Sequence, residues 1–409
     1  MKFINAIIPD KFLPTAMRSD SKAVKNFSKD LALKKKRVTA SLTHRRQFLA
    51  TMQQDELKLA IEMAEMPECP RRDYLYDIYR VALRDGHLYG EAAKAINKVV
   101  GSPYGIFKKG SKEINELATR LLMKDWFEEY RCYHEEARLW GHSLIQFLDM
   151  VESNEEGVKF EFKCIDLIPR EHVRPEEGFI VIDTSHETGI PFRDPVIAKQ
   201  LRLIEIGKPK NLGTMLIVSK EVIWKNYSRS DWSRTSEKFG QPMVVLKLNT
   251  TDTKEIDKAE EQAKNFGNNL WMIVDPEDEV DLKEPTFKDS YKIYKEKALF
   301  CNDEMSKALT WQTGTSDEKA YVGSAEVHER VLNDYVEAAK RKQTYHINDT
   351  LIPFLIEHGY PLKDCEFRYL SYDEANPEAA AQKEAQQNKS GGGASGKKDQ
   401  RPSSEDLLK

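Results

Sequence analysis

The chain contains 409 residues with a net charge of −4, and 40% of its residues are hydrophobic while 32% are charged. This length is sufficient for a sizeable core and for two or three domains. The small acidic excess argues against a protein that grips duplex nucleic acid over its whole surface, but it is compatible with a protein through which DNA passes.

The first part of the chain is interpreted as an N-terminal arm at 1–20 and a helical region at 21–154. Apolar residues recur at spacings of three, four and seven between about 21 and 66, and further helical patterns cover about 73–100 and 113–140. A basic run lies within the first pattern and consists of Lys34, Lys35, Lys36 and Arg37. Such a run can contact phosphate, although it is more often a solvated helix face, and both interpretations stay open.

The pattern becomes β-rich at about 155–211. Residues 142–147 and 158–163 alternate between apolar and polar, and 179–182 is a short apolar run, as is typical of strands. Several X-Pro pairs interrupt this segment. We therefore expect a small β-rich subdomain inserted between helical layers.

A long helix is predicted at 212–239, where apolar residues from Met215 to Phe239 recur at helical spacing. Gly240 and Pro242 end it. About 25 residues at roughly 1.5 Å each give a rod of about 35–40 Å, longer than most globular domains need. Periodicity alone favours an amphipathic helix on one core. Burial of the stripe, including Ile223, against neighbouring copies is the alternative.

The segment 240–325 alternates between strands and helices. Strands are predicted at 243–248 and 271–274, helices at about 252–266 and 289–309, and a polar loop from Trp311 to Ala320. The region 326–375 begins in a long helix at about 324–358, which Pro353 should kink or divide. Residues 376–409 are rich in Ala, Gln, Gly, Ser and Lys, which predicts a disordered tail.

No residue pattern indicates a catalytic, metal or cofactor site. The five cysteines are far apart without a C-x-x-C pair, which fits reduced thiols. His134 and His142 lack the H-E-x-x-H spacing, and no phosphate-binding glycine motif occurs. The acidic cluster Asp275, Asp278 and Asp281 is interpreted as a solvated turn rather than a cation site. No apolar stretch approaches the length that a membrane span requires, so we expect no membrane-spanning segment and no membrane partner.

Two ordered motifs carry a family resemblance. The first comprises Lys225-Asn226, Asp231-Trp232 and the run from Glu237 to Pro242, EKFGQP. The second is YVGSAEVH, from Tyr321 to His328, which follows the polar loop. Together they resemble the signatures of portal proteins of Mu-like bacteriophages, and the weaker similarity extends over about 20–370.

This resemblance implies an α+β, predominantly helical fold with the wing, stem and clip of a portal protein. It implies a stem helix at 212–239, a clip-like segment at 155–211 and a wing made of the helical blocks. A first stem helix, expected before the clip, is not distinguishable from the wing helices. The implied stem residues are Ile223, Trp224, Lys225, Tyr227, Asp231 and Trp232. The implied tunnel loop, which faces DNA, contains Trp311, Gln312, Thr313, Gly314, Thr315, Asp317, Lys319, Tyr321 and Gly323.

The resemblance also implies the partners. The chain is expected to form a ring, typically a dodecamer, in the virion at one capsid vertex after assembly in the host cytoplasm. Double-stranded DNA would pass through the channel, and terminase, head-completion or neck proteins and a major capsid or scaffold protein would bind outside it. The alternative function is a helical nucleic-acid-binding or minor head protein that uses the basic run at 34–37.

Overall fold

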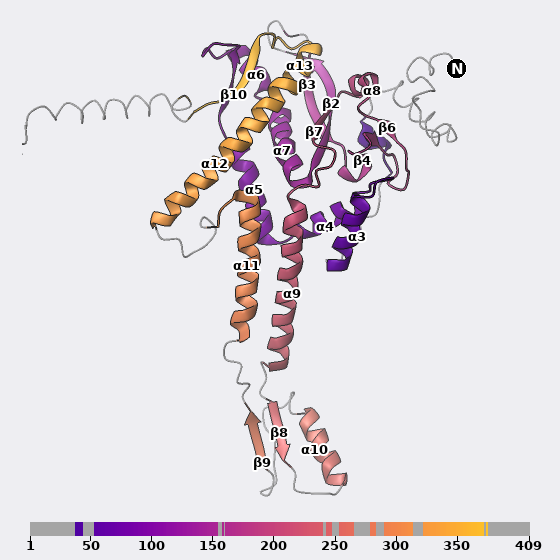
Figure 1. The fold of residues 1–409 in the computed structure, drawn as a ribbon, viewed down its shortest axis with the longest axis vertical. Helices are drawn as coiled ribbons and strands as arrows, with labels where there is room; N and C mark the ends of the chain where they lie inside the picture. The colour runs from indigo at the N-terminus through magenta and orange to yellow at the C-terminus, as the bar shows by residue number, and fades with distance from the viewer. Residues whose placement is uncertain are drawn as a thin grey trace, which may run out of the picture.

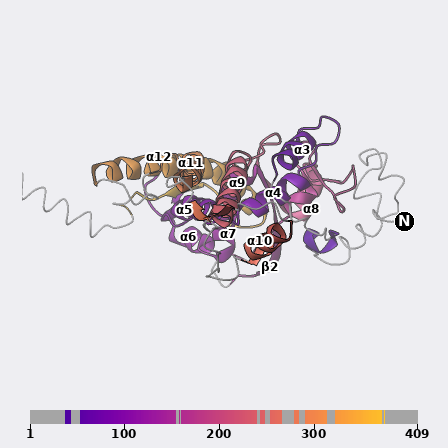
Figure 2. The same cartoon turned by 90° about the horizontal axis from the view of Figure 1, so that it is seen from below.

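The computed structural model describes residues 37–43, 53–153, 158, 160–239, 243–247, 253–265, 279–283, 290–313, 322–371 and 374. Within these residues the chain forms a mainly helical body from which two long antiparallel helices project (Figure 1). These are α9 (Met215–Phe239) and α11 (Ser290–Thr310), which we call the rod. Seen from below, the body is wide and thin (Figure 2). The α+β, predominantly helical class expected from the sequence is confirmed.

Side chains cap the start of some helices of the body. Asp85 accepts hydrogen bonds from the amides of His87 and Leu88 at the start of α5, and Asp194 caps α8, whose first residue is proline. The body helices are α3 (Gln54–Ala64), α4 (Asp73–Ala82), α5 (Gly86–Val100), α6 (Glu116–Leu122), α7 (Asp125–Trp140), α8 (Pro195–Leu201), α12 (Val322–His346) and α13 (Ile352–Glu357).

Small antiparallel sheets complete the described structure. The central sheet has the order β3-β2-β7, from Phe160–Leu167, His142–Glu152 and Leu203–Gly207, with Ile145 opposite both Leu167 and Ile204. A second sheet joins β4 (Val173–Arg174), β5 (Phe179–Ile180) and β6 (Ile190–Pro191), and a third joins β1 (Tyr104–Lys108) to β10 (Cys365–Tyr369). At the far end of the rod β8 (Met243–Lys247) pairs with β9 (Glu279–Lys283), beside α10 (Thr253–Asn265) (Figure 1).

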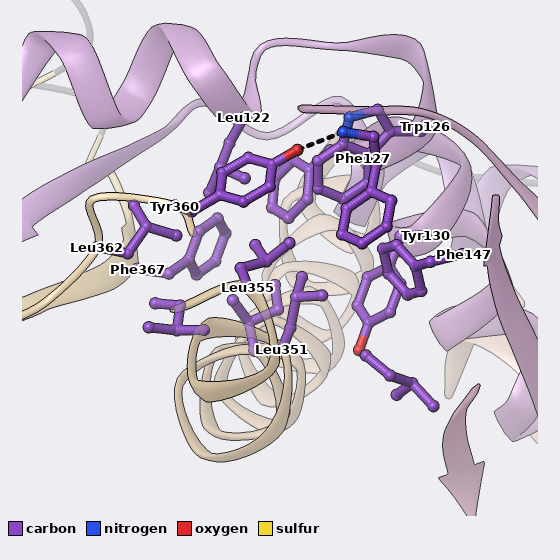
Figure 3. Packing of buried hydrophobic residues seen from close by; sticks show 14 of the residues in the cluster. Leu122, Trp126, Phe127, Tyr130, Phe147, Leu351, Leu355, Tyr360, Leu362 and Phe367 are labelled. Carbon is purple, nitrogen blue, oxygen red and sulfur yellow. Dashed lines mark hydrogen bonds between the residues drawn. The ribbon is translucent and has the colours of Figure 1, made fainter. Parts of the chain in front are cut away.

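The largest core cluster lies between α7, the central sheet and the C-terminal elements (Figure 3). Trp126, Phe127 and Tyr130 lie on one face of α7, because they recur at helical spacing, and they meet Phe147 of β2. The hydroxyl of Tyr360 accepts a hydrogen bond of 2.7 Å from the Phe162 amide. Segments far apart in the sequence thus share one apolar interior.

A second cluster holds the base of the rod. Met215, Val218 and Ile223 of α9 and Met305 and Leu309 of α11 are fully buried against α3, α4 and the end of α7. Among the described residues, α9 therefore packs against the body through its first half, and α11 through its last half.

Two glycines determine where the rod leaves the body. Gly141, at the end of α7, and Gly213, before α9, both have left-handed backbones, with φ of 89° and 81°. A Cβ at Gly141 would lie 2.1 Å from the backbone oxygen of Asn211, and one at Gly213 would lie 2.1 Å from that of Leu139. This backbone approach excludes any larger residue and ties the start of α9 to the end of α7.

Several sequence-based boundaries were wrong in detail. The helix expected over 21–66 is replaced, in the described part, by the short 3₁₀ helix Val38–Ser41 and by α3. The block at 73–100 divides at 83–85, where Asp85 caps a new helix, and the block at 113–140 divides at 123–124. The long C-terminal helix contains a π-helical turn, Ile347–Leu351, directly before the α13 turn that holds Pro353, which confirms the interruption expected from that proline. The strand expected at 271–274 lies outside the described residues.

The β-rich segment exists, but it belongs to the body. Ile168, Val173, Ile180 and Phe192 pack around Val38 and Leu42 in a third cluster. The described elements at the far end of the rod are instead β8, α10 and β9, and α11, which pairs with α9, follows them in sequence. The segment at 155–211 therefore packs with the body and does not lie at the far end of the rod.

Candidate functional site

The outer half of the rod is mostly exposed in the single chain. Its two helices contact each other through Ser228, whose hydroxyl donates to the Tyr294 carbonyl at 3.0 Å, and through Thr235, whose hydroxyl lies 3.0 Å from the Tyr294 hydroxyl. Beyond Ser228 the α9 side chains described are mostly exposed. The rod thus has a buried half and a projecting half.

The predicted stem residues divide between these halves. Ile223 is fully buried within its own chain, and Trp224 is partly buried with the Lys220 ammonium 4.7 Å from its ring centroid. Tyr227, Asp231 and Trp232 are exposed. The expectation that Ile223 contacts neighbouring copies is wrong, because its side chain already packs in the cluster at the rod base.

A buried polar seam joins the rod to α5. The ammonium of Lys225 lies 2.7 Å from a carboxylate oxygen of Asp85, the residue that caps α5. His87 Nε2 lies 2.8 Å from the Ser306 hydroxyl, and the hydroxyl of Thr310 donates to Glu91 at 3.0 Å.

Electrostatics favour the charged form of Asp85. Burial alone raises the pKa of this carboxyl, but hydrogen bonds from Lys225, Leu88 and His87 and the nearby ammonium charge lower it below its ordinary value. Lys225 was identified only through the family signature. Its partner Asp85 lies far away in the sequence, and no sequence signal linked it to Lys225.

The seam ends at the base of the predicted tunnel loop. Trp311 follows α11 with a left-handed φ of 63°, which is uncommon for a bulky residue, and 54% of its surface is exposed. Its ring meets Tyr335 of α12 edge-on at 5.3 Å, whereas Gln312 is buried. Thr313 is the last described residue before the gap.

Of the remaining residues of the predicted loop, Gly323 alone lies within the described part of the chain. Gly314, Thr315, Asp317, Lys319 and Tyr321 lie outside the described residues. Gly323 lies in the first turn of α12, so the helix begins earlier than expected and this residue is not part of a loop.

The basic run is described at one residue only. Arg37 is half exposed and forms an ion pair of 3.7 Å with Asp166, while Lys34, Lys35 and Lys36 lie outside the described residues. This pairing fits the solvated interpretation of Arg37, and phosphate contact stays untested.

Histidines and acids form structural contacts. His142 is buried and lies 3.0 Å from Glu205, which also pairs with Arg193. Burial raises the pKa of Glu205, but its bonds to Arg193 and His142 outweigh this effect and hold it at about 2. Among the described residues, no group of His, Cys, Asp or Glu is arranged to hold a metal ion, and no helix is long and apolar enough to cross a membrane.

Comparison with known families decides what this architecture is. The family model described as the portal protein of Mu bacteriophage matches residues 76–395, which is most of the chain. The chain belongs to this portal protein family. The recognition and the portal function expected from the two motifs are thereby confirmed.

Solved structures were compared for the fold alone. A virion of the native gene transfer agent particle contains a chain that is 13% identical, with a TM-score of 0.50 over 84% of this chain and 96% of that one. An HK97-family phage portal protein from Corynebacterium diphtheriae is 11% identical, with a TM-score of 0.41. The match covers 74% of this chain and 96% of that one. A chain in the neck of the native gene transfer agent particle, computed with C12 symmetry, is 14% identical, with a TM-score of 0.48. The match covers 83% of this chain and 95% of that one. A search of curated protein sequences found no match.

Proposed function

We propose that this portal protein forms a closed ring at a capsid vertex, in which α9 and α11 of each copy are the stem around a channel for double-stranded DNA. The observation that carries the proposal is the uncovered apolar surface of the rod. Ile293 and Phe300 of α11 are 70% and 56% exposed, and Tyr227 and Trp232 of α9 are 40% and 36% exposed.

A ring provides cover for this surface. Large apolar side chains on a projecting rod are unfavourable in water, and contiguous ones mark interaction sites. In a cyclic ring each rod has one neighbour on either side, so a heterologous interface covers both flanks in every copy. The family resemblance implies twelve copies.

The domain assignment follows from the rod. We assign the stem to α9 and α11 together, the clip to β8, α10 and β9 at their far end, and the wing to the body that contains 155–211. In this arrangement terminase and the neck proteins bind at the clip, and the capsid or scaffold protein binds the outer body. The polar loop after Trp311 faces DNA in the channel. Assembly takes place in the host cytoplasm, and the finished ring stays in the virion.

The test is the mass of the assembly in solution. Twelve copies of a 47.2 kDa chain weigh about 570 kDa by light scattering. The double variant Ile293→Asp/Phe300→Asp is expected to elute as a folded chain of low mass, because its two added charges would have to be buried in the contact between copies.

The matched control is Val196→Asp, at a similarly exposed apolar position on α8 away from the rod. It should assemble like the parent. Assembly of the rod variant to the parental mass would show that the rod is not the contact between copies.

A further inference from the structure

A cavity of about 600 Å³ lies between α7, the turn after β7, the start of α9 and α12. Its wall is mainly apolar, and it includes Ile206, Ala339 and Trp311. Cavities of this size, lined by apolar groups with a few polar ones, are typical of sites that receive a ligand or peptide segment.

The charged groups that line the cavity are mainly cationic. Arg138, Lys208 and Lys342 all line it, and the last two are exposed. Among the described lining residues Glu135 is the one acid, and its carboxylate is buried beside His134 Nδ1 at 3.3 Å and Arg138 Nε at 3.9 Å. The positive end of the α9 dipole adds to the charge. The site therefore suits an occupant that is both apolar and acidic.

The described chain ends close to this cavity. The Tyr369 ring lies 5.6 Å from the Lys340 ammonium, and the Tyr369 hydroxyl donates to Gln343. Lys340 and Gln343 directly follow the cavity residues Ala339 and Lys342 in α12, on an adjoining face of the helix. The segment that follows Glu374 therefore starts from the part of the body that carries this stretch of α12, with Glu374 itself 4.0 Å from Arg368.

That segment contains one apolar and acidic motif. From 375 to 409 the large apolar side chains are Leu407 and Leu408 alone, and Glu405 and Asp406 precede them directly. The intervening residues are mainly Ala, Gln, Gly, Ser and Lys. About 30 residues separate Glu374 from this motif, and binding sites joined within one chain see each other at effective concentrations in the millimolar range, so even weak binding would be populated.

We propose that the segment Ser403–Lys409 docks in this cavity. Leu407 and Leu408 contact its apolar walls, and Glu405 and Asp406 lie beside Lys208 and Lys342. The segment lies beyond the residues matched by the family model, which end at 395, so this contact is a property of this chain in addition to its portal function.

Photo-crosslinking of the full chain tests the docking. A benzophenone amino acid at position 408 should give adducts with 134–138, 206–214 or 335–342, within one chain or between two copies. The same probe at Gln387 is the control and should not react there selectively. Adducts located elsewhere, or a yield at these segments no higher than that of the control, would overturn the proposal.

A charge exchange adds a second criterion. Lys208→Glu combined with Lys342→Glu should reduce the adduct yield on the order of tenfold, because two ion pairs become repulsive, and both positions are exposed, so the fold should tolerate the change. Adding Glu405→Lys and Asp406→Lys to the same chain should restore the yield. An unchanged yield in the first variant, or no recovery in the second, would exclude charge recognition at this cavity.

Discussion

Replacement of Lys225 by alanine should loosen the base of the rod, because it leaves the Asp85 carboxylate buried without its cation. The two groups are 2.7 Å apart, with side chains that are 11% and 4% exposed. Removal of one partner from a buried ion pair typically costs about 3–5 kcal/mol. Asp85 would keep hydrogen bonds from the amides of His87 and Leu88, both 3.1 Å. We therefore expect the lower end of this range, about 3 kcal/mol.

Hydrogen exchange of the assembled protein measures this change locally. Amides of α5 and of the first half of α9 should exchange on the order of 100-fold faster in Lys225→Ala, since about 1.4 kcal/mol corresponds to a factor of ten. The control is Asp85→Asn with Lys225→Met, which removes both charges while the asparagine still caps α5. It should recover most of the protection. Parental exchange in Lys225→Ala, or a double variant as loose as the single one, would refute the role of the ion pair.

The same pair predicts a pH dependence. The pKa of Asp85 is lowered in the folded chain, so this group contributes stability above its unfolded pKa of about 3.9 and loses that contribution as pH falls through the folded value. The difference in protection between the parent and Lys225→Ala should therefore be constant from about pH 5 to 7 and shrink below about pH 4. A difference that grows on acidification would contradict the assignment.

Three further predictions concern other parts of the structure. Ile223→Asp should cost about 4 kcal/mol or more and reduce the yield of folded chain, because it places a charge in the rod-base cluster; a folded variant that merely fails to assemble would contradict the observed burial. Gly141→Ala should prevent folding, since its Cβ would lie 2.1 Å from a backbone oxygen, whereas Gly90→Ala in α5, with open space around it, should raise the melting temperature slightly. Lys319→Glu should alter DNA packaging or retention without changing ring mass, and shortening Thr313–Lys319 should impair packaging more severely, as counted in genomes per particle; normal packaging by the shortened loop would place it away from the channel.

Most helices could be predicted from the sequence, because periodicity, glycine and proline act on the backbone of the segment that contains them. The long helix α9 follows from helical periodicity and from the Gly240 and Pro242 signals, and the predicted interruption at Pro353 follows from the missing amide and fixed φ of proline. The division before α5 was missed although its cause, the capping side chain of Asp85, is visible in the sequence. These errors concern boundaries within correctly assigned elements.

The tertiary arrangement could not be predicted in the same way. The pairing of α9 with α11 rather than with an earlier helix depends on contacts between segments far apart in the chain, and both helices carry apolar residues that suit several partners. Strand β10 was missed because it pairs with β1, from the other end of the described chain, and so short a strand has little signal of its own. The cavity beside α12 likewise brings together several elements from distant parts of the chain, so its cationic lining had no counterpart in sequence spacing.

The position along α9 at which side chains stop being buried divides the residues expected to affect folding from those expected to affect assembly. An apolar side chain that is already buried within its own chain has no surface left to contact a neighbouring copy. Up to Ile223 and Lys225 the inward face of α9 is covered by α4, α5 and α11, so substitutions there act on the stability of the chain. From Tyr227 onward large side chains remain exposed, so substitutions there should act on the contact between copies. A stem that obtained all its burial from neighbours would not hold a fixed direction before assembly. A stem buried entirely within its own chain would have no surface with which to close a ring. In the proposed ring the amphipathic stripe would therefore serve two interfaces in succession, which the periodicity of its sequence does not distinguish.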